Sequence, residues 1–323
     1  MMQRRTLETT AQTAAKHGCA PSDRSLEALL SAGALHVDKP AGPTSHQVSA
    51  WARDIIGLER LGHGGTLDPF ATGLLTLMTG KSMRITQTVL GQDKRYLAVL
   101  RFPKSVETQQ IDGAFRSLTG EVWNVPPKES AVSIRVRSRT INDFKRLDSD
   151  DRQVVAEISC VAGTYIRTIA RDLGLLLDGR VELLELRRTR SGAMHVEQAV
   201  SMQQLVDAVW CWRELNDTAP MLRIVSPIES LLGTRPGLVV QDSAAAAVAH
   251  GASLARVGVV AIDGQFDEDE EIAIRTMKDE VVAMARSVVS SDDVESMKSG
   301  IVARPHTVLM ATDTYPRTWE RTE

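Results

Sequence analysis

The sequence contains little cysteine. Cys19, Cys160 and Cys211 are the only three among 323 residues, and they lie far apart, with no Cys-x-x-Cys pair and no histidine at metal-ligand spacing. Disulfide frameworks and structural zinc sites require several closely spaced ligands. The sequence therefore predicts neither of them, and we interpret the three thiols as buried or incidental.

Long apolar stretches are also absent. The longest, such as Leu29–Leu35, fall far short of the roughly 20 residues that a membrane-spanning helix needs. The start, Met1–Arg5, continues into threonine, glutamine, lysine and histidine rather than an apolar segment, so it does not resemble a secretory signal. We expect a soluble intracellular protein with no membrane partner.

The chain has no surplus of positive charge. Its 38 lysines and arginines face 41 acidic residues, which gives a net charge of −3, whereas RNA-binding proteins are usually basic. The distribution is uneven, however. Acidic residues cluster at Asp267–Glu271, and basic ones at Lys94–Arg95 and Arg187–Arg190. Because a local basic surface can bind phosphates on an acidic protein, composition leaves nucleic-acid binding open.

Hydrophobic patterning predicts an α+β fold. Tyr96–Phe102 and Val154–Val161 alternate as strands, Thr44 can cap a helix that ends at Gly57, and Leu74–Leu90 is predicted to be helical after its first residues. Strands that look antiparallel, with interspersed helices, are typical of this class. Residues 1–33 are interpreted as a polar extension and residues 34–233 as the main domain.

A second, smaller domain is predicted after a boundary near Thr234–Gly237. Short strands follow at close spacing, at 238–240, 257–262, 271–275, 281–286 and 301–310, with one helix at Ser243–His250. This pattern indicates a small barrel or sandwich. We place this domain at residues 234–316, followed by a tail at 317–323.

The most informative segment is the loop Gly62–Pro69, with the sequence Gly-His-Gly-Gly-Thr-Leu-Asp-Pro. Its glycines permit unusual backbone angles and close approach of a ligand. A carboxylate on such a loop, Asp68, can act as a nucleophile, a general base or a metal ligand. It can also simply hydrogen-bond a turn, the usual role of an isolated Asp-Pro pair.

This loop resembles the signature Gly-His-x-Gly-Thr-Leu-Asp-Pro of the TruB and dyskerin class of pseudouridine synthases. The resemblance implies that Asp68 is the catalytic nucleophile and that His63 helps to extrude the target base. Further segments are similar to other motifs of the class: Lys39–Ser45, Lys94–Tyr96, Pro126–Ala131, Gly163–Arg167 and Leu186–Gly192. The class also implies a catalytic domain with a mixed, mainly antiparallel sheet, and no metal or organic cofactor.

The same resemblance implies roles for five more residues. Tyr96 would stack on the flipped uridine, Tyr165 would share its cleft, Arg167 would pair with Asp68, and Leu186 would wall the pocket. Arg84 stands where bacterial members are expected to have lysine, in keeping with a phosphate-binding or structural role. From the residues alone, a tyrosine on a strand more often fills the core, and Arg167 would be an ordinary helix-face arginine.

The C-terminal region resembles a PUA domain, a β-barrel module that binds RNA. The similarity rests on Asp242–Ser243, on His250, Gly251 and Ala252, and on Gly258. Together with the ending Asp313–Trp319, it favours the archaeal and eukaryotic guide-dependent branch. That branch implies an H/ACA guide RNA, small H/ACA core proteins, and rRNA or tRNA substrates. His250 serves equally well as a helix cap.

The lysine-rich tails of nucleolar homologues are missing, which favours an archaeal cytoplasmic protein. Two other functions stay open. One is a guide-independent tRNA pseudouridine synthase. The other is a non-catalytic RNA-binding scaffold, against which the set Asp68, Tyr96, Tyr165 and Arg167 argues, because holding RNA does not require all four.

Overall fold

The computed structural model describes residues 3–126 and 135–316. The chain forms two compact units. The central unit holds residues 35–78 and 86–224, and the terminal unit joins the residues up to 34, residues 79–85 and the residues from 225 on. Most of the motif Pro126–Ala131, together with Trp319 and the tail 317–323, lies outside the described residues.

The central unit is built on a mixed sheet. Its strands lie in the order β2 (Gly33–Lys39), β4 (Thr72–Thr79), β9 (Glu182–Ser191), β5 (Lys94–Arg101), β8 (Gln153–Cys160), β7 (Arg137–Ser149) and β6 (Gly120–Asn124). The short strands β3 (Leu61–His63) and β10 (Met194–His195) pair with β4 and β9. β4 runs parallel to β9, whereas β9, β5, β8, β7 and β6 pair antiparallel along the sheet.

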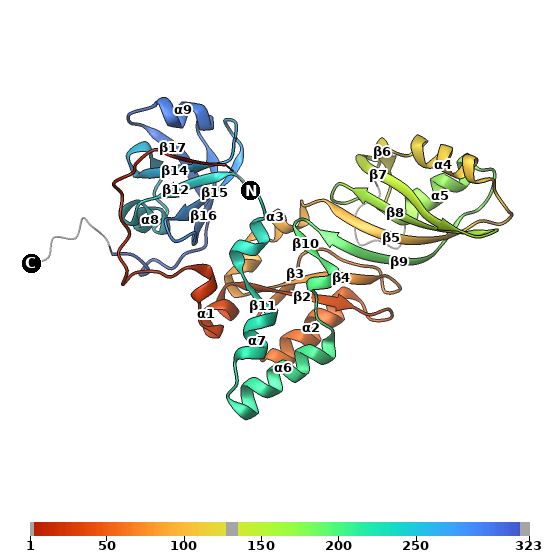
Figure 1. Cartoon of the computed structure of the whole chain (residues 1–323), viewed down its shortest axis with the longest axis horizontal. Helices are drawn as coiled ribbons and strands as arrows, with labels where there is room; N and C mark the ends of the chain where they lie inside the picture. Colours follow the sequence, from red (N-terminus) through yellow and green to blue (C-terminus); the bar gives the residue numbers. More distant parts are fainter. Residues whose placement is uncertain (1–2, 127–134, 317–323) are drawn as a thin grey trace, which may run out of the picture. The chain divides into compact units, whose positions relative to one another are not determined.

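Helices cover the central sheet. In Figure 1, α4 (Thr108–Ser117) and α5 (Ile166–Leu176) lie over one face of β5, β7, β8 and β9, where their apolar side chains complete the core. α2 (Ser45–Ile56) packs against α6 (Met202–Leu215), and α3 (Thr86–Leu90), α7 (Ala219–Ile224) and the 3₁₀ helix η3 (Val196–Gln198) complete this unit. As predicted, Thr44 caps α2, and Gly57 ends it at a positive φ of 78°.

The expected helix within 74–90 is wrong for its first half. The strand β4 continues to Thr79, the 3₁₀ helix η2 (Gly80–Ile85) follows, and α-helix begins only at Thr86. The segment from Gly73 to Thr79 is buried on both faces. An apolar run that is buried all round has no distinguishing period, so its sequence fits a buried strand and a buried helix equally well.

The terminal unit contains a second sheet, in the order β1 (Arg4–Thr6), β14 (Val259–Asp263), β12 (Gly237–Val240), β15 (Glu271–Thr276), β16 (Val281–Ser287), β17 (Ile301–Val308) and β13 (Leu254–Ala255). α8 (Asp242–Ala249) packs on β13, β15, β16 and β17. The five strands and the helix predicted in this region are confirmed. β1, which pairs with β14, is too short and polar to be predicted from the sequence.

The remaining elements of the terminal unit are short. They are α1 (Leu26–Ser31), α9 (Ser291–Ser296), β11 (Val225–Pro227), η1 (Pro21–Asp23), η4 (Ile228–Leu232) and η5 (Arg256–Gly258). The two units together confirm the α+β class. In the part of the chain that the structure describes, no helix is both long and apolar enough to cross a membrane.

Candidate functional site

The loop that carries Asp68 connects β3 to β4 and is held from both sides. The buried Ser45 hydroxyl, at the start of α2, accepts a hydrogen bond from the Leu67 amide at 2.8 Å and lies 3.2 Å from the Leu67 carbonyl. On the other side of Asp68, the ammonium group of Lys39 donates to the carbonyls of Pro69 (3.2 Å) and Ala71 (2.8 Å). Residues 39–45 therefore fix the backbone immediately before and after Asp68.

A second buried cation fixes the beginning of the loop. Arg188 on β9 is 2% exposed, and its guanidinium donates to the carbonyls of Leu74 (2.7 Å) and Gly65 (3.1 Å). Gly65 has a φ of 128°, which favours glycine, and a Cβ at Gly64 would lie 2.4 Å from the Val89 side chain. Arg188 was not among the site residues predicted from the sequence. Its signal was present in the run Arg187–Arg190.

Asp68 forms an ion pair with Arg167, as the resemblance implied. The distance between the Arg167 guanidinium and Asp68 Oδ1 is 2.9 Å, and the two side chains are 30% and 31% exposed, so a ligand can reach both. Arg167 lies in the first turn of α5. Asn124 holds the start of that helix, because its side chain accepts from the Tyr165 amide and donates to the Tyr165 carbonyl. The ion pair fixes the direction in which the carboxylate points.

Tyr96 and Leu186 line the buried side of this region. Both belong to the same apolar cluster as Leu67, and they are 9% and 7% exposed. In the sheet, Tyr96 stands opposite Arg188, and Leu186 stands opposite Ala98. Burial raises the pKa of the Tyr96 phenol, and the positive charge of Arg188 opposes that rise. Tyr96 is thus a protonated phenol at neutral pH. Tyr165, the other tyrosine predicted for this site, is half-buried at the start of α5.

His63 stands at the end of β3 beside a second histidine. Its ring meets the ring of His46 edge-on, with centroids 4.7 Å apart. Burial lowers the pKa of His63, and the nearby His46 and Arg188 lower it further. The ring is therefore neutral at physiological pH. Within the described residues, its buried Nδ1 atom has no hydrogen-bond partner.

The other predicted RNA-binding residues lie in the terminal unit. Arg84 is exposed on η2 and donates to the Val308 carbonyl at 2.9 Å. His250 follows α8, with its Nδ1 atom 2.9 Å from the Ala246 carbonyl, in keeping with the expected cap. Gly251, at a φ of 89°, and Ala252 are exposed beyond it. A hollow of about 260 Å³, lined in part by Ser253 and Leu254, adjoins this loop.

No metal centre is apparent among residues 3–126 and 135–316, where no group of three or more histidine, cysteine, aspartate or glutamate side chains is placed to hold an ion. What the structure does bring together is a carboxylate and a guanidinium, both open to solvent, above a layer of buried tyrosine, leucine and cations. This arrangement suits a nucleophile that acts on an anionic, partly apolar ligand.

Comparisons with known proteins agree with this arrangement. The chain matches the TruB family pseudouridylate synthase N-terminal domain over residues 53–118 and the tRNA pseudouridylate synthase B C-terminal domain over 167–233. It also matches the DKCLD domain over 2–49 and the PUA domain over 236–309. These four matches together cover most of both units.

Full-length relatives are also similar. A "Probable tRNA pseudouridine synthase B" from Methanothermobacter thermautotrophicus is 37% identical over 96% of this chain and 95% of its own length. A protein of the same name from Pyrococcus horikoshii is 36% identical over 97% and 94%. The chain belongs to the TruB family of pseudouridine synthases, and like its relatives it is an RNA-modifying enzyme.

Solved structures place it within that family. The Cbf5-Nop10-Gar1 complex contains a chain with 34% identity and a TM-score of 0.93, matched over 98% of this chain and 97% of the other. The archaeal box H/ACA sRNP Nop10-Cbf5 complex contains one with 33% identity and a TM-score of 0.91, over 99% of both. An H/ACA RNP bound to a substrate RNA with 2′-deoxyuridine contains another, with 32% identity and a TM-score of 0.93, over 99% of this chain and 98% of the other. The resemblance to the archaeal branch and the fold of both domains are confirmed.

Proposed function

We propose that this enzyme isomerises uridine in rRNA or tRNA, with Asp68 as the nucleophile, under the direction of an H/ACA guide RNA in a ribonucleoprotein. One observation supports the proposed role of Asp68 in the reaction. The Asp68 carboxylate is held by Arg167 at 2.9 Å on a loop braced before and after it, and it is still open to a ligand. A fixed, accessible carboxylate is what a covalent route through an aspartyl intermediate requires.

The reaction exchanges one bond of the nucleotide for another. The bond between C1′ of the sugar and N1 of uracil breaks, a bond between C1′ and C5 forms, and the proton on C5 is lost while N1 regains one. Because the target atoms are inaccessible in a base stack, the uridine must first be extruded. In this proposal, neutral His63 helps to extrude it, and Asp68 then attacks the flipped nucleotide.

The buried layer supports the same route. Tyr96 offers an aromatic face of the kind on which a base stacks, and Leu186 beside it helps to exclude water. Exclusion of water matters because the detached uracil must neither be hydrolysed nor diffuse away. Tyr165 is assigned to the same cleft, at the beginning of the helix that carries Arg167.

The proposed guided assembly is supported by the similarity of this chain to chains in solved complexes. Chains similar to this one over almost their whole length occur in complexes of Cbf5 with Nop10 and Gar1 and in an H/ACA RNP bound to a substrate RNA. We accordingly propose small H/ACA core proteins and a guide RNA as partners. The exposed loop of His250, Gly251 and Ala252 would contact RNA, and Arg84 a phosphate. The named relatives come from archaea, which supports a cytoplasmic location.

The proposed domains are a catalytic one at residues 34–233, an RNA-binding one at 234–316, an N-terminal extension at 1–33 and a tail at 317–323. The matches at 53–118, 167–233 and 236–309 support the two main domains.

The second candidate function is guide-independent modification of tRNA. It is favoured by the name of the curated relatives, tRNA pseudouridine synthase B.

One experiment separates these functions. Conversion of uridine to pseudouridine is measured on a tRNA transcript and on a guide-matched RNA, each with and without guide RNA and accessory proteins. We expect conversion of the guide-matched RNA only in the complete mixture. Conversion of tRNA by the chain alone would establish the guide-independent function. Bound RNA that is never converted would identify a non-catalytic scaffold.

A further inference from the structure

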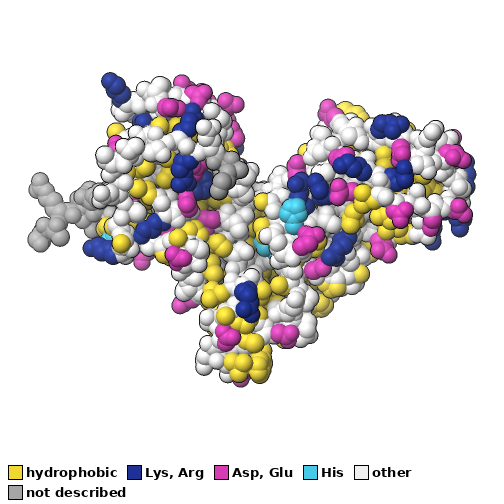
Figure 2. All heavy atoms as spheres, in the orientation of Figure 1, with side chains coloured by type: hydrophobic (Ala, Val, Ile, Leu, Met, Phe, Trp, Pro, Cys, Tyr) yellow, Lys and Arg dark blue, Asp and Glu magenta, His cyan; other side chains and the backbone are white. Residues whose placement is uncertain are grey.

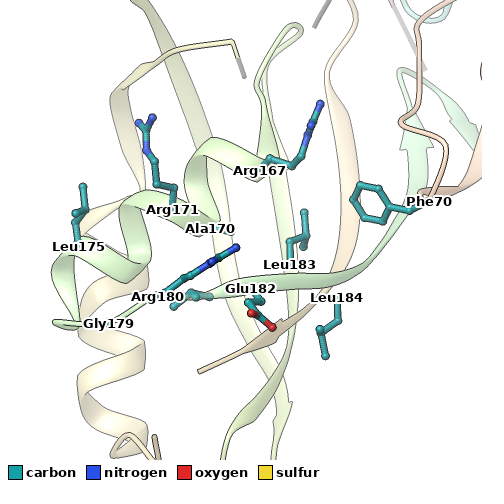
Figure 3. A pocket seen from close by; sticks show the side chains of 11 residues that line it. Phe70, Arg167, Ala170, Arg171, Leu175, Gly179, Arg180, Glu182, Leu183 and Leu184 are labelled. Atoms are coloured by element: carbon teal, nitrogen blue, oxygen red, sulfur yellow. The ribbon is translucent and has the colours of Figure 1, made fainter. Parts of the chain in front are cut away.

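A pocket of about 770 Å³ lies beside the Asp68–Arg167 pair, within the central unit. Figure 3 shows Phe70 projecting from its loop toward the strand segment that carries Leu183 and Leu184, with α5 on the other side. The volume falls within the range of roughly 300–1,000 Å³ that is typical of small-ligand sites. None of the roles proposed above uses this space, apart from the shared Arg167.

Phe70 is the unusual residue of the lining. It follows Asp68 by two positions, yet 39% of its surface is exposed, and its ring faces the pocket rather than the core. Leu175, on the α5 side of the pocket, is 74% exposed. Exposed apolar surface grouped in a hollow marks a binding site more often than isolated exposed side chains do. The flat ring gives this hollow a face on which a planar group can stack.

The charged residues of the lining are mainly positive. Arg167, Arg171 and Arg180 contribute to it, against Glu182 alone. Arg101 donates a hydrogen bond to the Glu182 carboxylate at 2.6 Å, and Asp172 forms an ion pair with Arg171. In the described part of the chain, Arg180 forms no ion pair, although the Glu182 carboxylate is close enough to interact with it electrostatically. The pocket therefore combines an aromatic face with cationic charge that is available to an anionic ligand.

We propose that this pocket receives a nucleotide of the substrate RNA that adjoins the target uridine, with its base on Phe70 and its phosphate near Arg180. The proposal rests on the proposed function, because it takes the uridine to be bound at Asp68. The pocket is continuous with the site of Asp68, which supports the proposal. Arg167 contacts Asp68 and also lines the pocket, and Phe70 belongs to the same loop as Asp68. A strand that enters the site of Asp68 must bring its neighbouring nucleotide and phosphate with it. Base–aromatic stacking and arginine–phosphate contacts are the ordinary means of holding single-stranded RNA.

A peptide strand is the competing occupant. β9 pairs with β4 only at Arg187 and Arg188, so the β4-side edge of its first residues has no strand partner among those described. An open strand edge can accept an added strand from a protein. The positive charge of Arg180 and the direct continuity with Asp68 favour RNA, because strand addition requires neither of them.

The test combines variants of the full chain with altered RNA, in whichever mixture gives conversion. Single-turnover conversion is measured for Phe70→Ala, Phe70→Leu, Phe70→Tyr and Arg180→Gln. Leu147→Ala and Arg116→Gln serve as matched controls, because both side chains are exposed and lie outside the pocket. Each enzyme receives RNA with an abasic nucleotide immediately before or after the target. In parallel, 4-thiouridine at either neighbour is photo-cross-linked to the enzyme, and the modified peptide is identified by mass spectrometry.

We expect Phe70→Ala and Phe70→Leu to slow conversion by roughly ten- to a hundredfold, the size of one base–aromatic stack, while Phe70→Tyr retains the native rate. An abasic nucleotide on the occupied side should slow the native enzyme equally and add little to the loss in Phe70→Ala. The cross-link should fall on the peptide that contains Phe70 or Arg180. The two control variants should behave as the native enzyme.

Two results would overturn the proposal. One is that the losses from Phe70→Ala and from the abasic nucleotide simply multiply, with no cross-link in the pocket from either neighbour. The other is that the pocket variants convert RNA normally but lose an accessory protein, which would assign the pocket to a peptide strand. If the native chain converts no uridine, the proposed function fails, and the cross-link still decides whether a nucleotide occupies the pocket.

Discussion

The two units of this protein bury charged side chains of different kinds. Among the residues that the structure describes, the buried charged side chains of the central unit are all cations, and those of the terminal unit are mixed. They are Lys39, Lys94 and Arg188 in the first, and Asp263, Arg275 and Glu280 in the second. Burying an unpaired charge costs several kcal/mol, so each unit must compensate that cost in its own way.

In the terminal unit, buried carboxylates meet donors from the protein's own side chains and backbone. Asp263 accepts from Arg4 on β1 at 2.7 Å, and Glu280 accepts from the Tyr315 hydroxyl and the Cys19 amide. These contacts hold the N-terminal segment against the second sheet. In this unit, buried charge serves the fold.

In the central unit, the buried cations donate mainly to backbone carbonyls. Lys39 and Lys94 each donate to three, and Arg188 donates to two. Carbonyl oxygens satisfy the donors but leave the positive charge in place, where the low dielectric of the interior weakens it little. A chain with net charge −3 thus keeps positive charge beneath the loop of Asp68. Figure 2 shows basic and acidic side chains interspersed over the visible face. Neither that surface nor the net charge reveals the buried cations.

The largest effect should come from removing the Asp68 carboxylate of the central unit. Asp68→Asn keeps the size of the side chain but removes its charge and nucleophilicity. We expect conversion to fall by at least about a thousandfold, since the chemical step loses its nucleophile, with RNA affinity retained. Conversion is measured in the complete guided mixture. Asp54→Asn, on the exposed part of α2, is the control. Normal conversion by Asp68→Asn would disprove the catalytic assignment.

Replacing a buried cation of the central unit should come next. Arg188→Met leaves the carbonyls of Gly65 and Leu74 without this donor, at about 1–3 kcal/mol each, so we expect the free energy of unfolding to fall by roughly 2–6 kcal/mol. The neighbouring Arg187→Met is the control, because Arg187 forms a half-exposed pair with Asp38 and should cost less than about 1 kcal/mol. Denaturant unfolding measures both. Equal losses would contradict the special role of the buried cation.

The pH dependence of stability should reveal the buried histidine of the central unit. Burial lowers the pKa of His36 on β2 to about 4. Because the unfolded chain binds this proton near pH 6.5, it holds more protons than the folded chain between those values, and stability falls as pH falls. We expect a loss of about 2 kcal/mol between pH 6.5 and 4.5 from this residue.

Denaturant unfolding at several pH values between these limits tests this expectation. His36→Leu should reduce the pH slope, whereas His195→Gln, which removes an exposed histidine on β10, should leave it unchanged. An unaltered slope in His36→Leu would mean that the acid sensitivity arises elsewhere.

The smallest effect should come from the exposed ion pairs of the terminal unit. Arg5 contacts Asp292 and Glu295, which are 74% and 51% exposed. Arg5→Gln should change the free energy of unfolding by less than about 1 kcal/mol and leave conversion unchanged, because solvent screens such pairs. Thermal unfolding in low and high salt checks this. A loss of several kcal/mol would show that pairing in the terminal unit contributes more than exposure suggests.

Much of the molecule followed from local sequence. Alternation and capping residues placed α2, α8 and most strands, because hydrophobic period and side-chain caps act over a few residues. The motif of Gly62–Pro69 identified the family and the candidate nucleophile, and the motif ending at Arg167 predicted its ion pair. Their roles in catalysis stay predictions until Asp68→Asn is measured.

Only the tertiary structure decided the rest. It made a strand of β4, where an apolar run had no period to distinguish strand from helix, and it paired β1 with β14 across the chain. It set Arg188 against Gly65, 123 residues away, and gave Phe70 a pocket formed by distant parts of α5 and β9. Such contacts depend on how far-separated segments meet in the folded chain. Local propensity and residue spacing do not determine which distant segments come into contact.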